Sequence, residues 1–140
     1  MEELLELRKS ITSGDYAKAL EIVDELEAMS KEDKLDKIYS YAIILLLHLI
    51  KQEAEQRTTK SWDVSLKNSV ERINRTNKRR KSGGYYAKKS ELQEIIDDAI
   101  APALRNASLE AFEGSCSEEE LLEMIDLNLI KNKALAMLDY

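Results

Sequence analysis

A chain of 140 residues has the length of one ordinary domain, and one proline with four glycines leaves little material for the turns of a β-sandwich or barrel. The formal charge of −6 argues against a chain that binds nucleic acid over its whole surface. The single cysteine excludes an intramolecular disulfide, and the amino terminus lacks the basic start and apolar run of a signal peptide. We therefore expect a cytoplasmic protein with no membrane segment.

The first helices are predicted from apolar residues that recur every three or four positions. Leu4, Leu7 and Ile11 share one face of a short amino-terminal helix. A second helix is predicted over residues 16–26. A separate third helix should begin after Ser30, which forms an approximate capping box with Asp33.

The third helix carries the most informative stretch of the chain. Tyr41 to Ile50 is apolar except for His48, the only histidine, and a helix that is apolar around its whole circumference belongs in the middle of a bundle. We expect His48 to be a structural residue, because its helical neighbours are mostly apolar. Its hydrogen-bond partner should be Gln52, Ser61 or a backbone carbonyl at the start of the helix that contains Trp62.

The fourth helix should be capped by Ser61 and opens on Trp62, the only tryptophan. We expect Trp62 to be largely buried against the central helix near His48, in which case Trp62→Ala should cost about 3–5 kcal/mol.

The pattern of residues in the last third of the chain predicts two further helices. The first should begin at Ser90 with a capping box to Gln93, and Pro102 should either kink it or restart it. Ser117 should cap a final helix that continues through Leu135. The predicted fold is all-α, with residues 1–140 forming a single compact bundle of five to six helices around the central apolar helix.

Charge is distributed unevenly along this bundle. Residues 51–89 hold twelve basic and four acidic side chains, whereas the segments on either side are acidic. The candidates for contact with a partner or a phosphate are Arg72, Arg75, Lys78, Arg79, Arg80, Lys81, Tyr85, Tyr86, Lys88 and Lys89. Basic and aromatic side chains together can bind phosphate and stack on bases. The same composition also occurs at a solvated helix end and on a surface that binds an acidic protein surface.

No catalytic or metal site is predicted. The sequence contains no nucleophile triad or glycine-rich phosphate loop, and the acidic pairs one helical turn apart, such as Glu21 with Asp24, are most simply solvated helix faces. We expect no cofactor, and an enzyme ranks third among the functional interpretations.

Three strings occur in an order that matches a known family: His48-Leu-Ile-Lys51, Ser61-Trp62 and Ser115-Cys116-Ser117. The acidic stretch from Glu21 to Ser30 is similar to the helix that precedes the long apolar helix in the same family. The chain resembles the cyanobacterial family called domain of unknown function 29 over residues 15–73 and, more loosely, over residues 90–125. The resemblance implies an all-helical cytoplasmic protein and carries no activity and no catalytic residue with it.

The predicted function is that of a non-enzymatic interaction or accessory protein that binds a protein partner or itself. The alternative is a nucleic-acid-associated accessory protein that uses residues 72–89. The acidic flanks would repel a polyanion near the basic segment, so we expect at most weak binding of nucleic acid at physiological salt.

Overall fold

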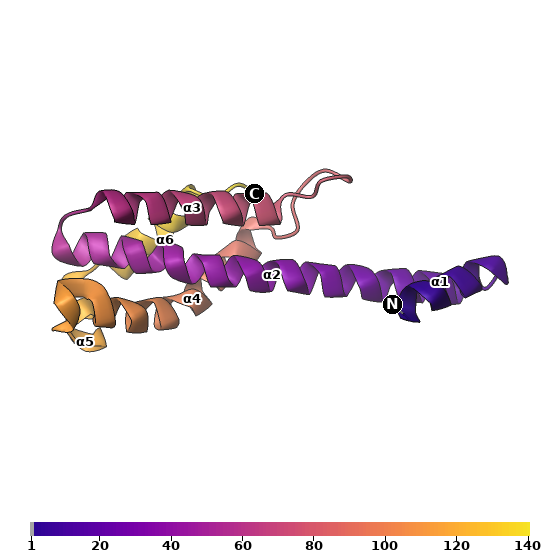
Figure 1. Cartoon of the computed structure of the whole chain (residues 1–140), viewed down its shortest axis with the longest axis horizontal. Helices are drawn as coiled ribbons and strands as arrows, with labels where there is room; N and C mark the ends of the chain where they lie inside the picture. Colours follow the sequence, from indigo (N-terminus) through magenta and orange to yellow (C-terminus); the bar gives the residue numbers. More distant parts are fainter. Residues whose placement is uncertain (1) are drawn as a thin grey trace. The chain divides into compact units, whose positions relative to one another are not determined.

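The computed structural model describes residues 2–140, and every regular element in this range is a helix (Figure 1). The elements are α1 (Glu2–Thr12), α2 (Tyr16–Glu55), α3 (Lys60–Asn77), α4 (Lys89–Glu110), the 3-10 turn η1 (Ala111–Gly114), α5 (Glu118–Met124) and α6 (Leu127–Ala136). This confirms the all-α prediction. None of these helices is both long enough and apolar enough to cross a bilayer.

The chain separates into two compact units, residues 1–33 and residues 34–140, called here the amino-terminal and carboxy-terminal units. A single domain over the whole chain stays a prediction. In the amino-terminal unit, α1 and the first part of α2 form a helical hairpin. Its turn holds Gly14 at a φ of +79°, and the amide of Asp15 donates to the carbonyl of Ser10 at 2.8 Å. The buried side chains of this hairpin are Ser10, Ala19 and Ile22.

The predicted break at Ser30 is wrong, because α2 runs without interruption from Tyr16 to Glu55. The residues around Ser30 contain no glycine or proline, and a serine inside a helix costs only a few tenths of a kcal/mol, of order ~0.5, relative to alanine. A residue that favours a cap does not by itself end a helix whose neighbours are good helix formers.

Two predicted caps are each displaced by two residues. The N-cap of α3 is Thr59, whose hydroxyl accepts from the amide of Trp62 at 3.1 Å, so Ser61 lies exposed in the first turn. At the start of α4, the amide of Lys88 donates to the side chain of Glu91 at 3.1 Å, in place of a box between Ser90 and Gln93. Thr59 and Ser61 both carry a hydroxyl that can cap a helix, so the path of the connecting segment decides which of the two caps α3.

The carboxy-terminal helices differ from the prediction in number. Helix α4 continues through Pro102 as one helix. Ser117 caps α5 with Glu120 as predicted. The predicted final helix is two helices, because the side chain of Asp126 accepts from the amide of Leu129 at 3.1 Å and starts α6.

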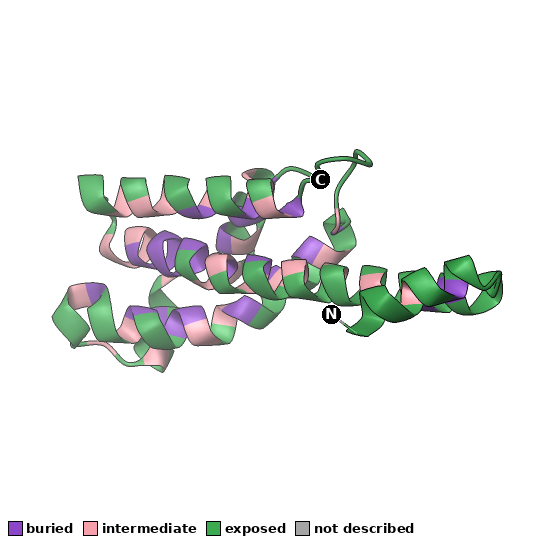
Figure 2. Ribbon diagram, turned by 45° about the vertical axis from the view of Figure 1, so that its right-hand side comes forward, coloured by how far each residue is buried: buried purple, intermediate pink, exposed green. Residues whose placement is uncertain are grey.

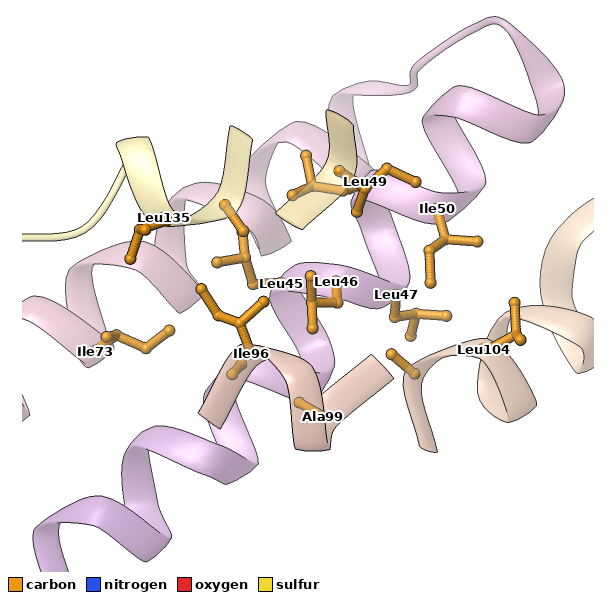
Figure 3. Packing of buried hydrophobic residues seen from close by; sticks show 14 of the residues in the cluster. Leu45, Leu46, Leu47, Leu49, Ile50, Ile73, Ile96, Ala99, Leu104 and Leu135 are labelled. Carbon is orange, nitrogen blue, oxygen red and sulfur yellow. The ribbon is translucent and has the colours of Figure 1, made fainter. Parts of the chain in front are cut away.

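The core of the carboxy-terminal unit surrounds the central stretch of α2. Leu45 to Ile50 are six consecutive buried residues (Figure 2). Figure 3 shows leucines of this stretch among side chains from the other helices, including Ile73 of α3, Ile96 of α4 and Leu135 of α6. Helix α4 also packs against η1, α5 and α6. A helix with neighbours on several sides needs apolar residues around its circumference, which is the pattern that the sequence contains.

Candidate functional site

A buried asparagine at the end of α3 fixes the segment that follows it. Asn77 has no exposed surface. Its Oδ1 accepts from the amide of Ala87 at 2.7 Å, and its Nδ2 donates to the carbonyls of Ala87 at 3.4 Å and Asp139 at 3.3 Å. One side chain therefore joins the end of α3, the segment that leads into α4 and the carboxy-terminal residues after α6.

The segment between Asn77 and Ala87 folds back on itself as a short ordered loop. Lys78 and Tyr85 form an isolated antiparallel bridge, and the amide of Arg79 donates to the carbonyl of Gly84 at 3.0 Å. Gly83 and Gly84 both have a φ of +73°, a backbone conformation that glycine adopts without steric cost. The basic residues of this loop are therefore held in place by backbone hydrogen bonds.

A basic groove lies between this loop, α3 and the part of α2 in the carboxy-terminal unit. Its main pocket has a volume of about 670 Å³. The pocket is lined by Lys34, Lys37, Tyr41, Arg75, Thr76, Lys78, Arg80, Lys81, Ser82 and Tyr86. Six of these side chains are cationic and none is a carboxylate. Since hydroxyl groups and two tyrosines complete the lining, the chemistry of the pocket suits an anion.

A second pocket of about 400 Å³ continues the basic groove along α3. It shares Tyr41, Arg75 and Thr76 with the main pocket and adds Asn68, Glu71 and Arg72. The guanidinium carbon of Arg72 lies 5.6 Å from the ring centre of Tyr41, a cation–π contact that sets an aromatic ring and a cation side by side in the groove.

Four cations of the groove form no ion pair within the described part of the chain. No carboxylate of residues 2–140 lies within 4.0 Å of the charged nitrogens of Arg75, Lys78, Arg80 or Lys81. Two acidic residues of the carboxy-terminal third form ion pairs with residues that do not line the main pocket, Glu110 with Lys51 at 3.0 Å and Asp97 with Lys131 at 3.0 Å.

Six of the ten residues predicted to contact a partner or a phosphate line the basic groove, and four do not. Those that line the basic groove are Arg72, Arg75, Lys78, Arg80, Lys81 and Tyr86, and those that line neither of its pockets are Arg79, Tyr85, Lys88 and Lys89. The guanidinium carbon of Arg79 lies 5.0 Å from the ring centre of Tyr86, and its Nε is buried without a hydrogen-bond partner.

One side of the groove comes from α2 and lies outside the basic segment that the sequence pattern indicated. Lys34, Lys37 and Tyr41 are spaced by three and four, so they share one face of the helix. That spacing was visible in the sequence. What was not visible is that this face turns toward Arg75, because the two helices are joined by a link whose geometry the sequence does not state.

A second polar cluster lies at the other end of α3, around Trp62. The ammonium of the buried Lys51 lies 4.5 Å from the Trp62 ring centre and 3.0 Å from a carboxylate oxygen of Glu110. The guanidinium carbon of Arg57 lies 4.7 Å from the same ring. Trp62 is of intermediate burial and lies against Lys51 of α2, outside the core cluster, so its burial is that of a rim residue and the prediction that it is largely buried near His48 stays a prediction. Trp62 lies in the first turn of α3, where its ring contacts the cations of Lys51 and Arg57.

His48 is buried beside this cluster without the predicted hydrogen bond. Its Nδ1 has no partner, while Gln52 donates to Thr58 at 2.9 Å and to Asp63 at 3.3 Å. Burial lowers the pKa of His48 below its ordinary value, the charge of Lys51 lowers it further, and Glu110 opposes the shift. Residues 2–140 bring no three His, Cys, Asp or Glu side chains together in a group that could hold a metal ion.

The fold and this site define a class of protein, a helical bundle with a cationic groove beside its core. The family described as Domain of unknown function DUF29 matches residues 9–132, and the chain belongs to that family. No curated protein and no solved structure matched the chain.

Proposed function

We propose that this chain is a non-enzymatic interaction module that associates with a second copy of itself through the helical hairpin of the amino-terminal unit. The observation that carries the proposal is the apolar surface that this hairpin leaves uncovered. The large apolar side chains exposed there are Leu4, Leu5, Ile11, Tyr16, Leu20, Val23 and Met29. Monomeric proteins rarely expose so many large apolar side chains on so short a segment.

The exposed residues follow helical spacing on both helices of the hairpin. On α1, Leu4, Leu7 and Ile11 line an apolar groove of about 310 Å³ together with Arg8 and Thr12. On α2, Tyr16, Leu20 and Val23 form a stripe that is separate from the buried Ala19 and Ile22. The hairpin thus has apolar side chains beyond those that join its own two helices.

A second copy suits this surface because two helical hairpins can pair as a four-helix bundle, with each apolar stripe seated between helices of the other copy. A segment of this length also buries too little apolar area to be stable alone. Residues 1–33 carry ten acidic and four basic side chains, so two copies repel each other electrostatically. The pairing should therefore strengthen as salt screens that repulsion.

The test compares two matched substitutions of exposed leucines. Leu20 is 63% exposed in the amino-terminal unit and Leu109 is 73% exposed in the carboxy-terminal unit. We expect light scattering after gel filtration to find a dimer of the unmodified chain at about 100 μM and a monomer of Leu20→Gln, while Leu109→Gln stays dimeric. The fraction of dimer should rise between about 50 and about 300 mM salt.

Two results would contradict this proposal. An unmodified chain that is monomeric at about 100 μM in both salts would exclude self-association and leave a different protein as the occupant of the hairpin. A dimer that Leu109→Gln disrupts and Leu20→Gln does not would place the interface in the carboxy-terminal unit.

A further inference from the structure

We propose that the basic groove binds single-stranded nucleic acid through its phosphodiester backbone. This inference concerns the carboxy-terminal unit and does not depend on association through the hairpin. It is carried by the joining of two parts of the chain that the sequence keeps apart, Lys34 and Lys37 on α2 and the cations of residues 72–81.

The charge of the groove selects an anion with several phosphates. Six cationic side chains line one pocket, and Arg72 adds a seventh in the adjoining pocket, where Glu71 is the carboxylate. Cations gathered in a concave site with low-dielectric walls attract anions more strongly than the same cations spread over a convex surface. The acidic net charge of the rest of the chain confines a polyanion to this groove and discourages contact elsewhere.

The size of the groove favours a strand over a single phosphate. The main pocket alone has about 670 Å³, the space of roughly twenty water molecules at their liquid volume. The α3 residues that line the two pockets run from Asn68 to Thr76, which is about 12 Å along a helix. That length accepts about three nucleotides of a stacked strand at a rise of ~3.4 Å each.

The polar and aromatic side chains of the groove suit binding of a single strand without preference for particular bases. Thr76 and Ser82 bring hydroxyl donors to the groove, and Tyr41 and Tyr86 bring aromatic surface to it. Proteins that hold single strands combine a cationic channel with aromatic side chains on which bases stack, and such stacking tolerates any base. The ordered loop that Asn77 holds places Lys78, Arg80 and Lys81 along one wall in advance, which lowers the entropic cost of binding.

The experiment measures fluorescence anisotropy of a labelled single-stranded oligonucleotide of mixed sequence, about 12 nucleotides long, in about 50 and about 150 mM salt. The groove variant is Lys34→Gln with Arg75→Gln. The control is Lys88→Gln with Lys89→Gln, which removes the same charge from residues that line neither pocket. Circular dichroism checks that both variants remain helical.

We expect the groove variant to bind at least about tenfold more weakly than the unmodified chain and the control about twofold more weakly at most. The slope of log affinity against log salt should become shallower by about 1.4 in the groove variant, since each lost phosphate contact to a single strand contributes about 0.7. Loss of binding with Lys34→Gln alone would support the groove directly, because Lys34 lies far from the basic segment in the sequence.

Three results would overturn the proposal. Equal losses in the groove variant and the control would show that net charge alone binds the strand. Tighter binding of inorganic tripolyphosphate than of the oligonucleotide, measured by competition, would show that the groove takes a compact anion. Tighter binding of polyglutamate than of the oligonucleotide would show that the groove fits an acidic protein surface.

Discussion

The two units of this chain use the same apolar spacing with different results. In the carboxy-terminal unit, the side chains at that spacing form one cluster that includes Leu46, Ile73 and Ile96 (Figure 3). In the amino-terminal unit, Leu20 and Leu5 stand at comparable positions on their helices and are more than 60% exposed. The difference teaches that apolar periodicity locates the face of a helix that can be covered, and that it does not say what covers it.

The two proposed interaction surfaces also differ in the sign of their charge. The hairpin is acidic, while the basic groove of the carboxy-terminal unit gathers cations. Salt should therefore act in opposite directions on the two proposed interactions, strengthening the pairing of hairpins and weakening the hold on a strand. One salt series on one preparation thus separates the two proposals.

The largest expected effect contrasts a core leucine with an exposed one. Leu46 is fully buried, whereas Leu20 is 63% exposed. We expect Leu46→Ala to lower the free energy of unfolding by about 3–5 kcal/mol, because it leaves a cavity, and Leu20→Ala to change it by less than about 0.5 kcal/mol. Urea titration at a concentration dilute enough for monomers measures both values. Equal losses would mean that the two units bury their leucines to the same extent.

A smaller effect is expected from the asparagine that orders the wall of the groove. Asn77→Ala leaves the buried amide of Ala87 without its acceptor, so we expect a loss of about 2–3 kcal/mol. Asn68→Ala, on the exposed face of the same helix, serves as the control and should cost less than about 0.5 kcal/mol. Hydrogen exchange should show faster exchange at the Ala87 amide in Asn77→Ala. An unchanged exchange rate would show that Asn77 does not hold the loop.

A substitution of Trp62 tests how much less a residue at the rim of the carboxy-terminal unit contributes to stability than a core residue. Because Trp62 is half-buried and covered by Lys51 and Arg57, Trp62→Ala should cost about 1–2 kcal/mol, less than a core aromatic would. Trp62→Phe keeps a ring under both cations and should retain most of that stability. Thermal and urea unfolding measure the two variants, and a loss above about 3 kcal/mol for Trp62→Ala would show a fully buried ring.

The smallest effect concerns pH. The folded chain lowers the pKa of His48 below its ordinary value of 6.5, so the unfolded chain takes up this proton at a higher pH than the folded one. Stability from the neutral imidazole is complete above about pH 6.5 and declines as the pH falls below it. Urea titrations at about pH 7.5 and about pH 5.5 should show this decline in the unmodified chain and a smaller one in His48→Gln. Since the chain has one histidine, an identical decline in both would assign it to other groups.

Local features were predictable where the physical cause was local. The cap at Ser117 depends on a side chain and an amide three residues apart, and that cap is confirmed. The caps expected at Ser61 and Ser90 depend on the same chemistry, but in each case the residue two positions earlier takes the N-cap position in competition with the serine. Such competition is decided by the direction from which the chain enters the helix, which is a property of the whole fold.

The sequence by itself determined the helical class, the central position of Tyr41 to Ile50 and the existence of a basic segment, because spacing and composition act along the chain. The tertiary structure decided which charges meet. Lys34 faces Arg75 in one pocket, and Asn77 reaches Asp139 across 62 positions, through contacts that no local pattern encodes. A groove is made by elements that pack side by side, so its lining is known only once the core has set their arrangement.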